Sequence, residues 1–131
     1  MEELIEKAKE GRLNASVPYS EFYVGAALKT KSGKIYTGCN VENHGIQSIC
    51  AERTAFVKAI SEGEREFECI LVLAGQEKNG ELEFCTPCGY CRQFMSEYVD
   101  KDFKVYAYYG EGNVDTFTIE DLLPHSFELE E

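Results

Sequence analysis

The feature that most constrains the fold is an uninterrupted apolar run from Cys69 to Ala74, near the middle of the chain. A short run of this kind is typical of a β-strand. Because it does not alternate with polar residues, we expect the strand to be buried on both of its faces. Such a strand needs other elements to cover it above and below, which favours a sheet with helices on its faces.

The rest of the chain supplies elements of both kinds. Helix-forming composition and apolar spacing predict helices over 1–14, 51–61 and 88–99 and a capped helical turn over 118–124. Extended patterns predict further strands over 22–28, 34–39, 104–109 and 115–118. The first two of these form a hairpin, and the later alternation of strands and helices indicates one mixed sheet. With 131 residues, we expect residues 1–131 to be a single domain.

The charge balance limits the partners of the chain. It has 24 acidic and 13 basic residues, which gives a formal net charge of −11. Because negative charge repels phosphate, we expect neither a nucleic-acid polymer nor an anionic membrane surface as a partner. No apolar run approaches the ~20 residues that cross a bilayer, and residues 1–7 lack the features of an export signal. We therefore expect a cytoplasmic protein.

Six cysteines are many for this length, and three of them have the spacing of a metal site. In a reducing compartment, metal binding or catalysis is a more frequent role for cysteine than a disulfide. Cys88-x-x-Cys91 follows Pro87 at a predicted helix start, which directs two sulfurs toward one ion. Cys50 precedes another predicted helix and offers a third thiolate. Three ligands with an open fourth position are the pattern of a catalytic zinc, whereas four closed ligands indicate a structural one.

Two charged residues follow Cys50 closely. Glu52 lies near the predicted metal without being an obvious ligand, which suits a general acid and base that acts on zinc-bound water. Three thiolates overcompensate the charge of Zn²⁺ and leave one net negative charge. The positive N-terminal ends of the two predicted helices compensate for it, as does Arg53, which can donate hydrogen bonds to the thiolates.

Cys50-Ala-Glu52 followed by Pro87-Cys-x-x-Cys91 resembles the signature of the zinc-dependent nucleoside deaminases. The resemblance to the cytidine deaminase family covers nearly the whole chain. It is carried by Pro18-Tyr-Ser20, Phe22, Val24 to Leu28, Gly38 to Asn43, Cys50 to Ala55, Ser61-Glu-Gly63, Pro87-Cys-Gly89, Cys91-Arg-Gln93, Leu122-Leu-Pro124 and Phe127. It implies an α/β fold in three layers, α-β-α, around a central mixed five-stranded sheet.

The resemblance also implies a reaction. Cys50, Cys88 and Cys91 would hold one Zn²⁺ per chain. Glu52 would take a proton from the zinc-bound water, protonate the ring nitrogen N3 and help to expel ammonia, while hydroxide attacks C4 of the pyrimidine. Cytidine, and with it deoxycytidine, would be hydrolysed to uridine or deoxyuridine plus ammonia, a step of pyrimidine salvage.

Further positions match the substrate contacts of the family. They are Asn40 and Glu42 for the sugar hydroxyls, the backbone N–H of Ala51 for the base carbonyl, and Phe22 for packing on the base. Phe127 matches an aromatic residue that family members insert into the site of a neighbouring subunit. Because the small members of the family are homotetramers with shared active sites, we expect the same assembly here.

The loop around Glu42 bears on the choice of substrate. A carboxylate there accepts hydrogen bonds from hydroxyls but repels a 5′-phosphate, which favours a nucleoside over a nucleotide. The net charge independently favours the same choice. The loop from Asn43 to Ile49 is one residue shorter than in family members, and it contains His44 but no tyrosine, which the family loop often carries. This departure keeps open another cytosine nucleoside, such as an antibiotic of the blasticidin type.

Other interpretations of the cysteines remain open. Cys39 or Cys85 could complete a closed structural zinc site, and 85–91 resembles part of an iron–sulfur pattern, although no fourth cysteine follows. A non-catalytic zinc or iron–sulfur binding module is therefore the alternative of another class. A redox dithiol would leave the motif at 50–52 unexplained. We expect buried hydrophobic roles for Cys39, Cys69 and Cys85, and solvated rings for His44 and His125.

Overall fold

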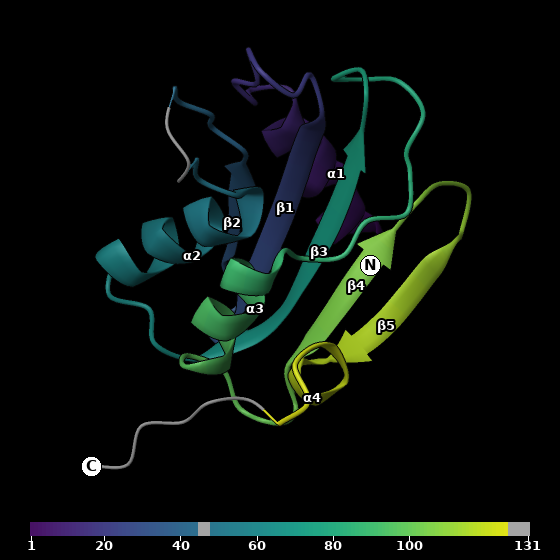
Figure 1. The fold of residues 1–131 in the computed structure, drawn as a ribbon. Coiled ribbons are helices and arrows are strands. Elements are labelled where there is room, and N and C mark those ends of the chain that lie inside the picture. Colours follow the sequence, from purple (N-terminus) through teal and green to yellow (C-terminus); the bar gives the residue numbers. More distant parts are fainter. Residues whose placement is uncertain (45–47, 126–131) are drawn as a thin grey trace.

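The computed structural model describes residues 1–44 and 48–125, and its elements follow the predicted order (Figure 1). Over these residues the helices are α1 (Glu2–Arg12), α2 (Ala51–Ser61), α3 (Gly89–Ser96) and α4 (Ile119–Leu122). The strands are β1 (Tyr23–Thr30), β2 (Ile35–Cys39), β3 (Phe67–Gly75), β4 (Lys104–Tyr108) and β5 (Val114–Thr118). None of these helices is long and apolar enough to cross a lipid bilayer.

The strands form one five-stranded sheet in the order β2-β1-β3-β4-β5. Strands β3 and β4 run parallel, with Ile70 opposite Val105, and all other neighbouring pairs are antiparallel. The single parallel pair needs a crossover, and the connection through α3 provides it. The mixed sheet and the hairpin of β1 and β2 are therefore as predicted.

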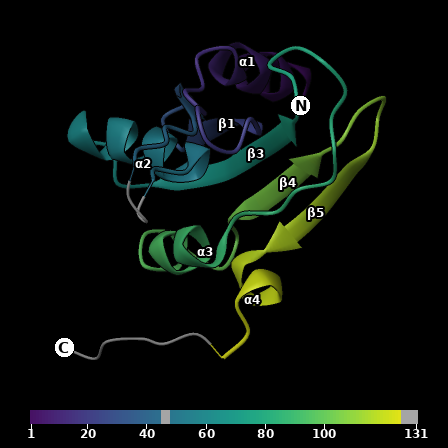
Figure 2. The ribbon, with the colours of Figure 1, turned by 45° about the horizontal axis from the view of Figure 1, so that its top comes forward.

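The central strand β3 is buried on both faces, as its unbroken apolar sequence predicts. Leu71 and Leu73 pack on one face with Leu4 and Ala8 of α1. Ile70 and Val72, which alternate with these leucines along β3, pack on the other face. They form a second cluster with Phe56 of α2 and Met95 of α3. Figure 2 shows α1 on one side of the sheet and α2, α3 and α4 on the other. The three-layer α-β-α fold is thus confirmed.

Glycines let both helical layers approach the sheet closely. A Cβ at Gly25 would lie 2.1 Å from the carbonyl oxygen of Ala8 in α1. A Cβ at Gly38 would lie 2.2 Å from the carbonyl oxygen of Ala51, at the first residue of α2. Since Cβ atoms do not approach backbone oxygen so closely, only glycine fits at either position. Gly38 therefore lets the N-terminus of α2 lie directly on the edge strand.

Some boundaries and burial predictions were wrong. Helix α3 ends at Ser96 and not at Val99 as predicted. The chain turns after Ser96, although the N–H of Val99 still bonds to the carbonyl of Met95. Of the three cysteines expected to be buried hydrophobic residues, Cys69 is buried, whereas Cys39 and Cys85 are half-buried. Cys39 ends the edge strand β2, and Cys85 belongs to the connection before α3. Thr118 and Asp121 form the expected cap of α4 as a reciprocal capping box.

Candidate metal centre and active site

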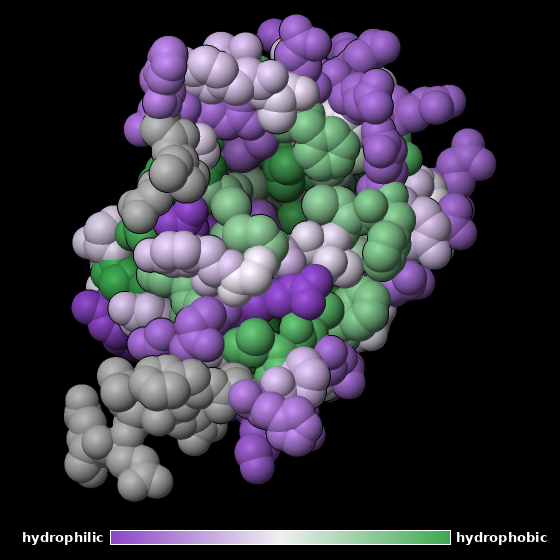
Figure 3. Space-filling view, viewed as in Figure 1, coloured by the Kyte–Doolittle hydropathy of each residue, from purple (hydrophilic) through white to green (hydrophobic). Residues whose placement is uncertain are grey.

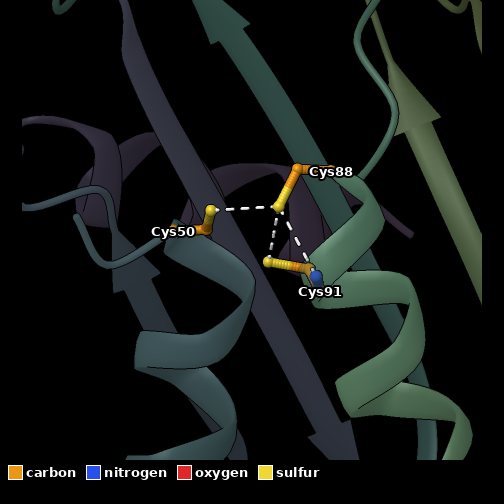
Figure 4. Close-up of side chains that lie close together, drawn as sticks. All are labelled: Cys50, Cys88 and Cys91. Atoms are coloured by element: carbon orange, nitrogen blue, oxygen red, sulfur yellow. Dashed lines mark hydrogen bonds between the residues drawn. The ribbon is translucent and has the colours of Figure 1, made fainter. Parts of the chain in front are cut away.

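Three cysteine sulfurs meet between the starts of α2 and α3 (Figure 4). Cys50 is the N-cap residue of α2, Cys88 is the N-cap residue of α3, and Cys91 lies in the first turn of α3. The sulfur of Cys88 lies 3.2 Å from that of Cys50 and 3.3 Å from that of Cys91. Two helix N-termini thus point positive backbone dipoles at one cluster of thiols, which favours thiolate.

The triangle of sulfurs fits a zinc ion. Tetrahedral Zn–S bonds of about 2.3 Å place sulfurs about 3.8 Å apart. The three Sγ atoms lie within 4.8 Å of one another and need to separate only slightly to reach that geometry. Among the described residues, no other cysteine, histidine or carboxylate joins this group, so Cys39, Cys85, His44 and His125 are not fourth ligands. The arrangement is that of a three-ligand site with an open position, and Cys88 is exposed toward solvent.

The cysteines at the site differ in acidity. A hydrogen bond from the Cys91 thiol, with a smaller contribution from Arg53, lowers the pKa of Cys50 to about 5 despite its partial burial. Burial raises the pKa of Cys85 to about 11, and the nearby Glu52 and Cys88 act in the same direction. Burial also raises the pKa of Cys88, so position and not acidity distinguishes the ligands. Cys85 lies outside the group of converging sulfurs and therefore belongs to the protein around the site.

Glu52 lies in the first turn of α2 and is only 4% exposed. Burial raises the pKa of its carboxyl group to about 7, and the neighbouring Cys50 acts in the same direction. A glutamate that merely compensated the helix dipole would be expected at the surface. Glu52 is instead buried beside the cysteines without belonging to the ligand group, which is the placement predicted for a general acid and base.

Arg53 spans the outer side of the cluster. Its Nη2 donates to the carbonyl of Ser48 at 2.8 Å and lies 4.0 Å from the sulfur of Cys50. The guanidinium carbon also lies 4.1 Å from the ring centroid of Tyr90, which is 61% exposed. The predicted contact of Arg53 with a thiolate is thus present. The stacking of Tyr90 was not predicted, because nothing in the spacing of the cysteines indicates it.

Asn40 follows β2 and bonds the start of β1. Its Nδ2 donates to the carbonyl of Phe22 at 2.8 Å, and its Oδ1 accepts from the N–H of Val24 at 3.0 Å. One N–H and one lone pair of the amide are left for a ligand. Val41 pairs with Ser16 and with Ile49, which ties the same loop to the residue before Cys50. The loop that bears Asn40 is therefore attached to β1 and to the metal cluster.

Glu42 binds the segment before β1. One carboxylate oxygen accepts from the backbone N–H groups of Tyr19 and Ser20, at 3.2 and 3.0 Å, and the other accepts from the Ser20 hydroxyl. Partial burial opposes ionisation, but these hydrogen bonds outweigh it and hold the pKa of Glu42 below its ordinary value. The exposed ring of His44 packs edge-on against Tyr19, with the centroids 5.6 Å apart.

The structure thus brings most predicted site residues into two connected groups. The metal group contains Cys50, Cys88, Cys91, Glu52 and Arg53, and the loop group contains Phe22, Asn40 and Glu42. Ala51 is fully buried at the first position of α2, where a backbone N–H has no partner within the helix. The predicted contact of Phe127 lies outside the described residues. Sequence reasoning gave Ser20 no role of its own, although it lies in one of the motifs that carry the family resemblance.

A zinc site of three cysteines with a buried glutamate that is not a ligand defines the class of zinc-dependent base deaminases. A family model described as "Cytidine and deoxycytidylate deaminase zinc-binding region" matches residues 1–107, and the chain belongs to this family. It is 43% identical over its whole length to the cytidine deaminase of Sporosarcina psychrophila, of which the match covers 93%. The expected family and its zinc cofactor are thereby confirmed.

Solved structures agree with the sequence comparison. The crystal structure of cytidine deaminase from Burkholderia pseudomallei matches with a TM-score of 0.86 and 42% identity, over 96% of this chain and 98% of that chain. Blasticidin-S deaminase from Bacillus cereus is a more distant relative, 31% identical over 126 residues that cover 93% of this chain and 88% of that protein. The greater similarity is therefore to proteins named as cytidine deaminases.

Proposed function

We propose that this chain hydrolyses cytidine and deoxycytidine to uridine and deoxyuridine, with release of ammonia. The observation that carries the proposal is the burial of Glu52 beside three converging cysteine sulfurs. A non-catalytic zinc module would need only the sulfurs and has no use for a buried carboxyl group. The names of the relatives support cytidine over blasticidin S as the substrate.

Cys50, Cys88 and Cys91 would hold the metal. When bound, Zn²⁺ lowers the pKa of water toward neutrality and so supplies a nucleophile at pH 7. Glu52 takes the proton that the attacking water loses and transfers it to N3 of the ring. The oxygen adds to C4, the C4–N4 bond breaks, and the remaining water proton leaves with the amino group as ammonia. The reaction consumes one water and no oxidant, and it returns Glu52 to its starting state.

The loop group would hold the nucleoside. The carboxylate of Glu42 and the amide of Asn40 have acceptor or donor capacity left for sugar hydroxyls. The backbone N–H of Ala51 would bind the base carbonyl and Phe22 would pack on the base. A 5′-phosphate would meet the ionised Glu42 in a chain with a net charge of −11, so we propose nucleosides and not nucleotides as substrates.

We further propose that residues 1–131 form one domain that assembles into a homotetramer in the cytoplasm. The face that carries α2 and α3 has apolar side chains at its centre and hydrophilic ones around its rim (Figure 3). The large hydrophobic side chains that the single chain exposes include Tyr19, Val57, Phe84, Tyr90 and Tyr98. Contact between subunits would cover such surface. In that assembly Phe127 would reach the site of a neighbouring subunit.

The test is a substrate panel on the purified, zinc-loaded protein. Ammonia release and loss of the cytosine absorbance are followed for cytidine, deoxycytidine, cytidine 5′-monophosphate and blasticidin S. We expect turnover of the two nucleosides at a kcat/KM at least about a hundredfold above that of the nucleotide or the antibiotic. Preference for blasticidin S would replace the proposed substrate. Zinc binding with no turnover of any of the four would contradict the proposed function.

A further inference from the structure

Ser20 stands between two of the residues assigned to the nucleoside, and it contacts both. We propose that Ser20 is a positioning residue, which fixes the Glu42 carboxylate for the sugar hydroxyls through hydrogen bonds from its backbone and its side chain. This inference rests on the proposed function, because Glu42 is the group through which Ser20 acts. Ser20 itself touches neither the metal cluster nor, in our assignment, the substrate.

The first support is the geometry around Glu42. Its Oε1 accepts from the N–H groups of Tyr19 and Ser20, and its Oε2 accepts from the Ser20 hydroxyl. A carboxylate has about four acceptor sites, so three hydrogen bonds orient it fully and leave about one site for a hydroxyl of the ligand. Bonds to a charged acceptor are about twice as strong as neutral ones. The Glu42 side chain is thus held by the 19–20 segment rather than free to rotate.

The second support is that the same hydroxyl fixes the chain toward Phe22. The Ser20 oxygen donates to Glu42 and accepts from the N–H of Phe22 at 3.1 Å. Between them, Glu21 has a φ of 56°, in the left-handed region that non-glycine residues rarely adopt. The N–H of Glu21 bonds to the carbonyl of Val17 at 3.1 Å, which helps to hold this conformation. A strained residue kept by its neighbours' hydrogen bonds is typical of a functional loop.

The third support is that this segment is fixed at its other end by Asn40. That amide bonds the carbonyl of Phe22 and the N–H of Val24. The two assigned sugar contacts, Asn40 and Glu42, are therefore bonded to opposite ends of the 19–24 segment. Asn40 bonds it with its own side chain, whereas the second carboxylate oxygen of Glu42, Oε2, is bonded by the Ser20 hydroxyl. Loss of that hydroxyl should leave Oε2 without its partner and loosen the carboxylate, while the backbone bonds to Oε1 remain. Asn40, the metal cluster and Glu52 should stay in place.

Three variants test the proposal. Ser20→Ala removes the hydroxyl, and Ser20→Thr keeps it. Ser61→Ala is the matched control, because the exposed Ser61 bonds only the carbonyl of Lys58 at the far end of α2 among the described contacts. Each variant is measured with cytidine and with 2′,3′-dideoxycytidine, which lacks both ring hydroxyls. The dideoxy substrate distinguishes sugar recognition from a general loss of structure, since the latter would affect both substrates alike.

We expect Ser20→Ala to lower kcat/KM for cytidine about tenfold, and that for the dideoxynucleoside less than about threefold. Ser20→Thr should restore most of the cytidine value, and Ser61→Ala should match the wild type on both substrates. An equal loss on both substrates, or no loss on either, would overturn the inference while the proposed function stands. Failure of the wild-type enzyme to turn over cytidine would overturn both.

Discussion

At the scale of single residues, the charge of the metal site depends on Arg53. With zinc bound, three thiolates leave one net negative charge, and the guanidinium of Arg53 is the cation beside Cys50. Its position is fixed on one side by the carbonyl of Ser48 and on the other by the ring of Tyr90. A cation over an aromatic face at an exposed position contributes about 0.5–1 kcal/mol. Tyr90 therefore has a modest but measurable role in keeping Arg53 against the thiolates.

Replacement of Tyr90 tests that role. Tyr90→Ala should release zinc to an excess of a chromogenic chelator about threefold faster than the wild type, because Arg53 loses one of its two supports. Tyr90→Phe keeps the aromatic face and should release zinc at close to the wild-type rate. If Tyr90→Phe releases zinc as fast as Tyr90→Ala, the phenol hydroxyl and not the stacked ring holds Arg53, and the proposed role of the ring is wrong.

Glu42 gives a prediction about pH. Hydrogen bonds from Ser20 and Tyr19 outweigh partial burial and keep its pKa below the ordinary 4.5, so it stays ionised as pH falls through that value. Between about pH 5.5 and 8 its charge should not change. The ratio of kcat/KM for cytidine to that for 2′,3′-dideoxycytidine cancels titrations that affect both substrates, and it should be constant over this range. A ratio that falls toward pH 5.5 would show that Glu42 is not the carboxylate that reads the sugar.

At the scale of elements, the site depends on how closely α2 lies on β2. Gly38 permits the contact, and the hydroxyl of Thr54 in α2 donates to the carbonyl of Cys39 at 3.0 Å. The next turn of the helix is fixed by packing, since Ala55 and Phe56 are fully buried against the sheet. These contacts determine where Cys50 and Glu52 are held relative to the ligands of α3.

Gly38→Ala should therefore disturb both stability and metal binding. The new methyl group would meet the backbone of Ala51, which cannot move without shifting Cys50. We expect a loss of about 2 kcal/mol or more in the free energy of unfolding, and weaker zinc binding in a competition assay. Gly89→Ala is the matched control, because nothing lies within 4 Å of a Cβ at that position. Equal effects of the two substitutions in denaturant titrations would argue against the close approach of α2.

The elements also show what a sequence can and cannot reveal. The unbroken run at 69–74 specifies a buried central strand, helical spacing specifies α2, and a capping pair specifies α4, because these signals are local. The end of α3 and the partial burial of Cys39 and Cys85 depend on neighbours that are distant in sequence. The bonds of Ser20 to Glu42 and the stacking of Tyr90 on Arg53 are contacts of the same kind. The family motifs contain the metal ligands, Glu52 and Arg53, but they do not reveal the contacts that fix Arg53 and Glu42.

At the scale of the whole molecule, the arrangement of layers explains why the site lies at helix ends. Helices α2 and α3 cover the same face of the sheet, and their N-termini meet where Cys50 and Cys88 cap them (Figures 1 and 4). The same face exposes hydrophobic side chains at its centre (Figure 3). A site that opens on such a surface is well placed to be completed by another subunit.

The proposed homotetramer predicts the mass in solution and the effect of removing Phe127 on KM. Sedimentation equilibrium should report a species of four chains at micromolar concentration. Phe127→Ala should raise KM for cytidine several-fold while the sedimenting mass stays that of four chains, because the residue would act in the neighbouring site rather than in the main contact between subunits. A monomer that is fully active when diluted to nanomolar concentration would contradict the shared site.

In the proposed reaction, the buried carboxyl group of Glu52 transfers the protons of a zinc-dependent deamination. The most direct measurement is the turnover of cytidine by Glu52→Gln, made together with its zinc content and unfolding midpoint, and with the exposed Glu66→Gln as the control. We expect one zinc per chain and an intact fold in both variants, with kcat lowered at least about a hundredfold only in Glu52→Gln. Glu52→Gln that binds zinc and keeps the full kcat would contradict the proposed reaction.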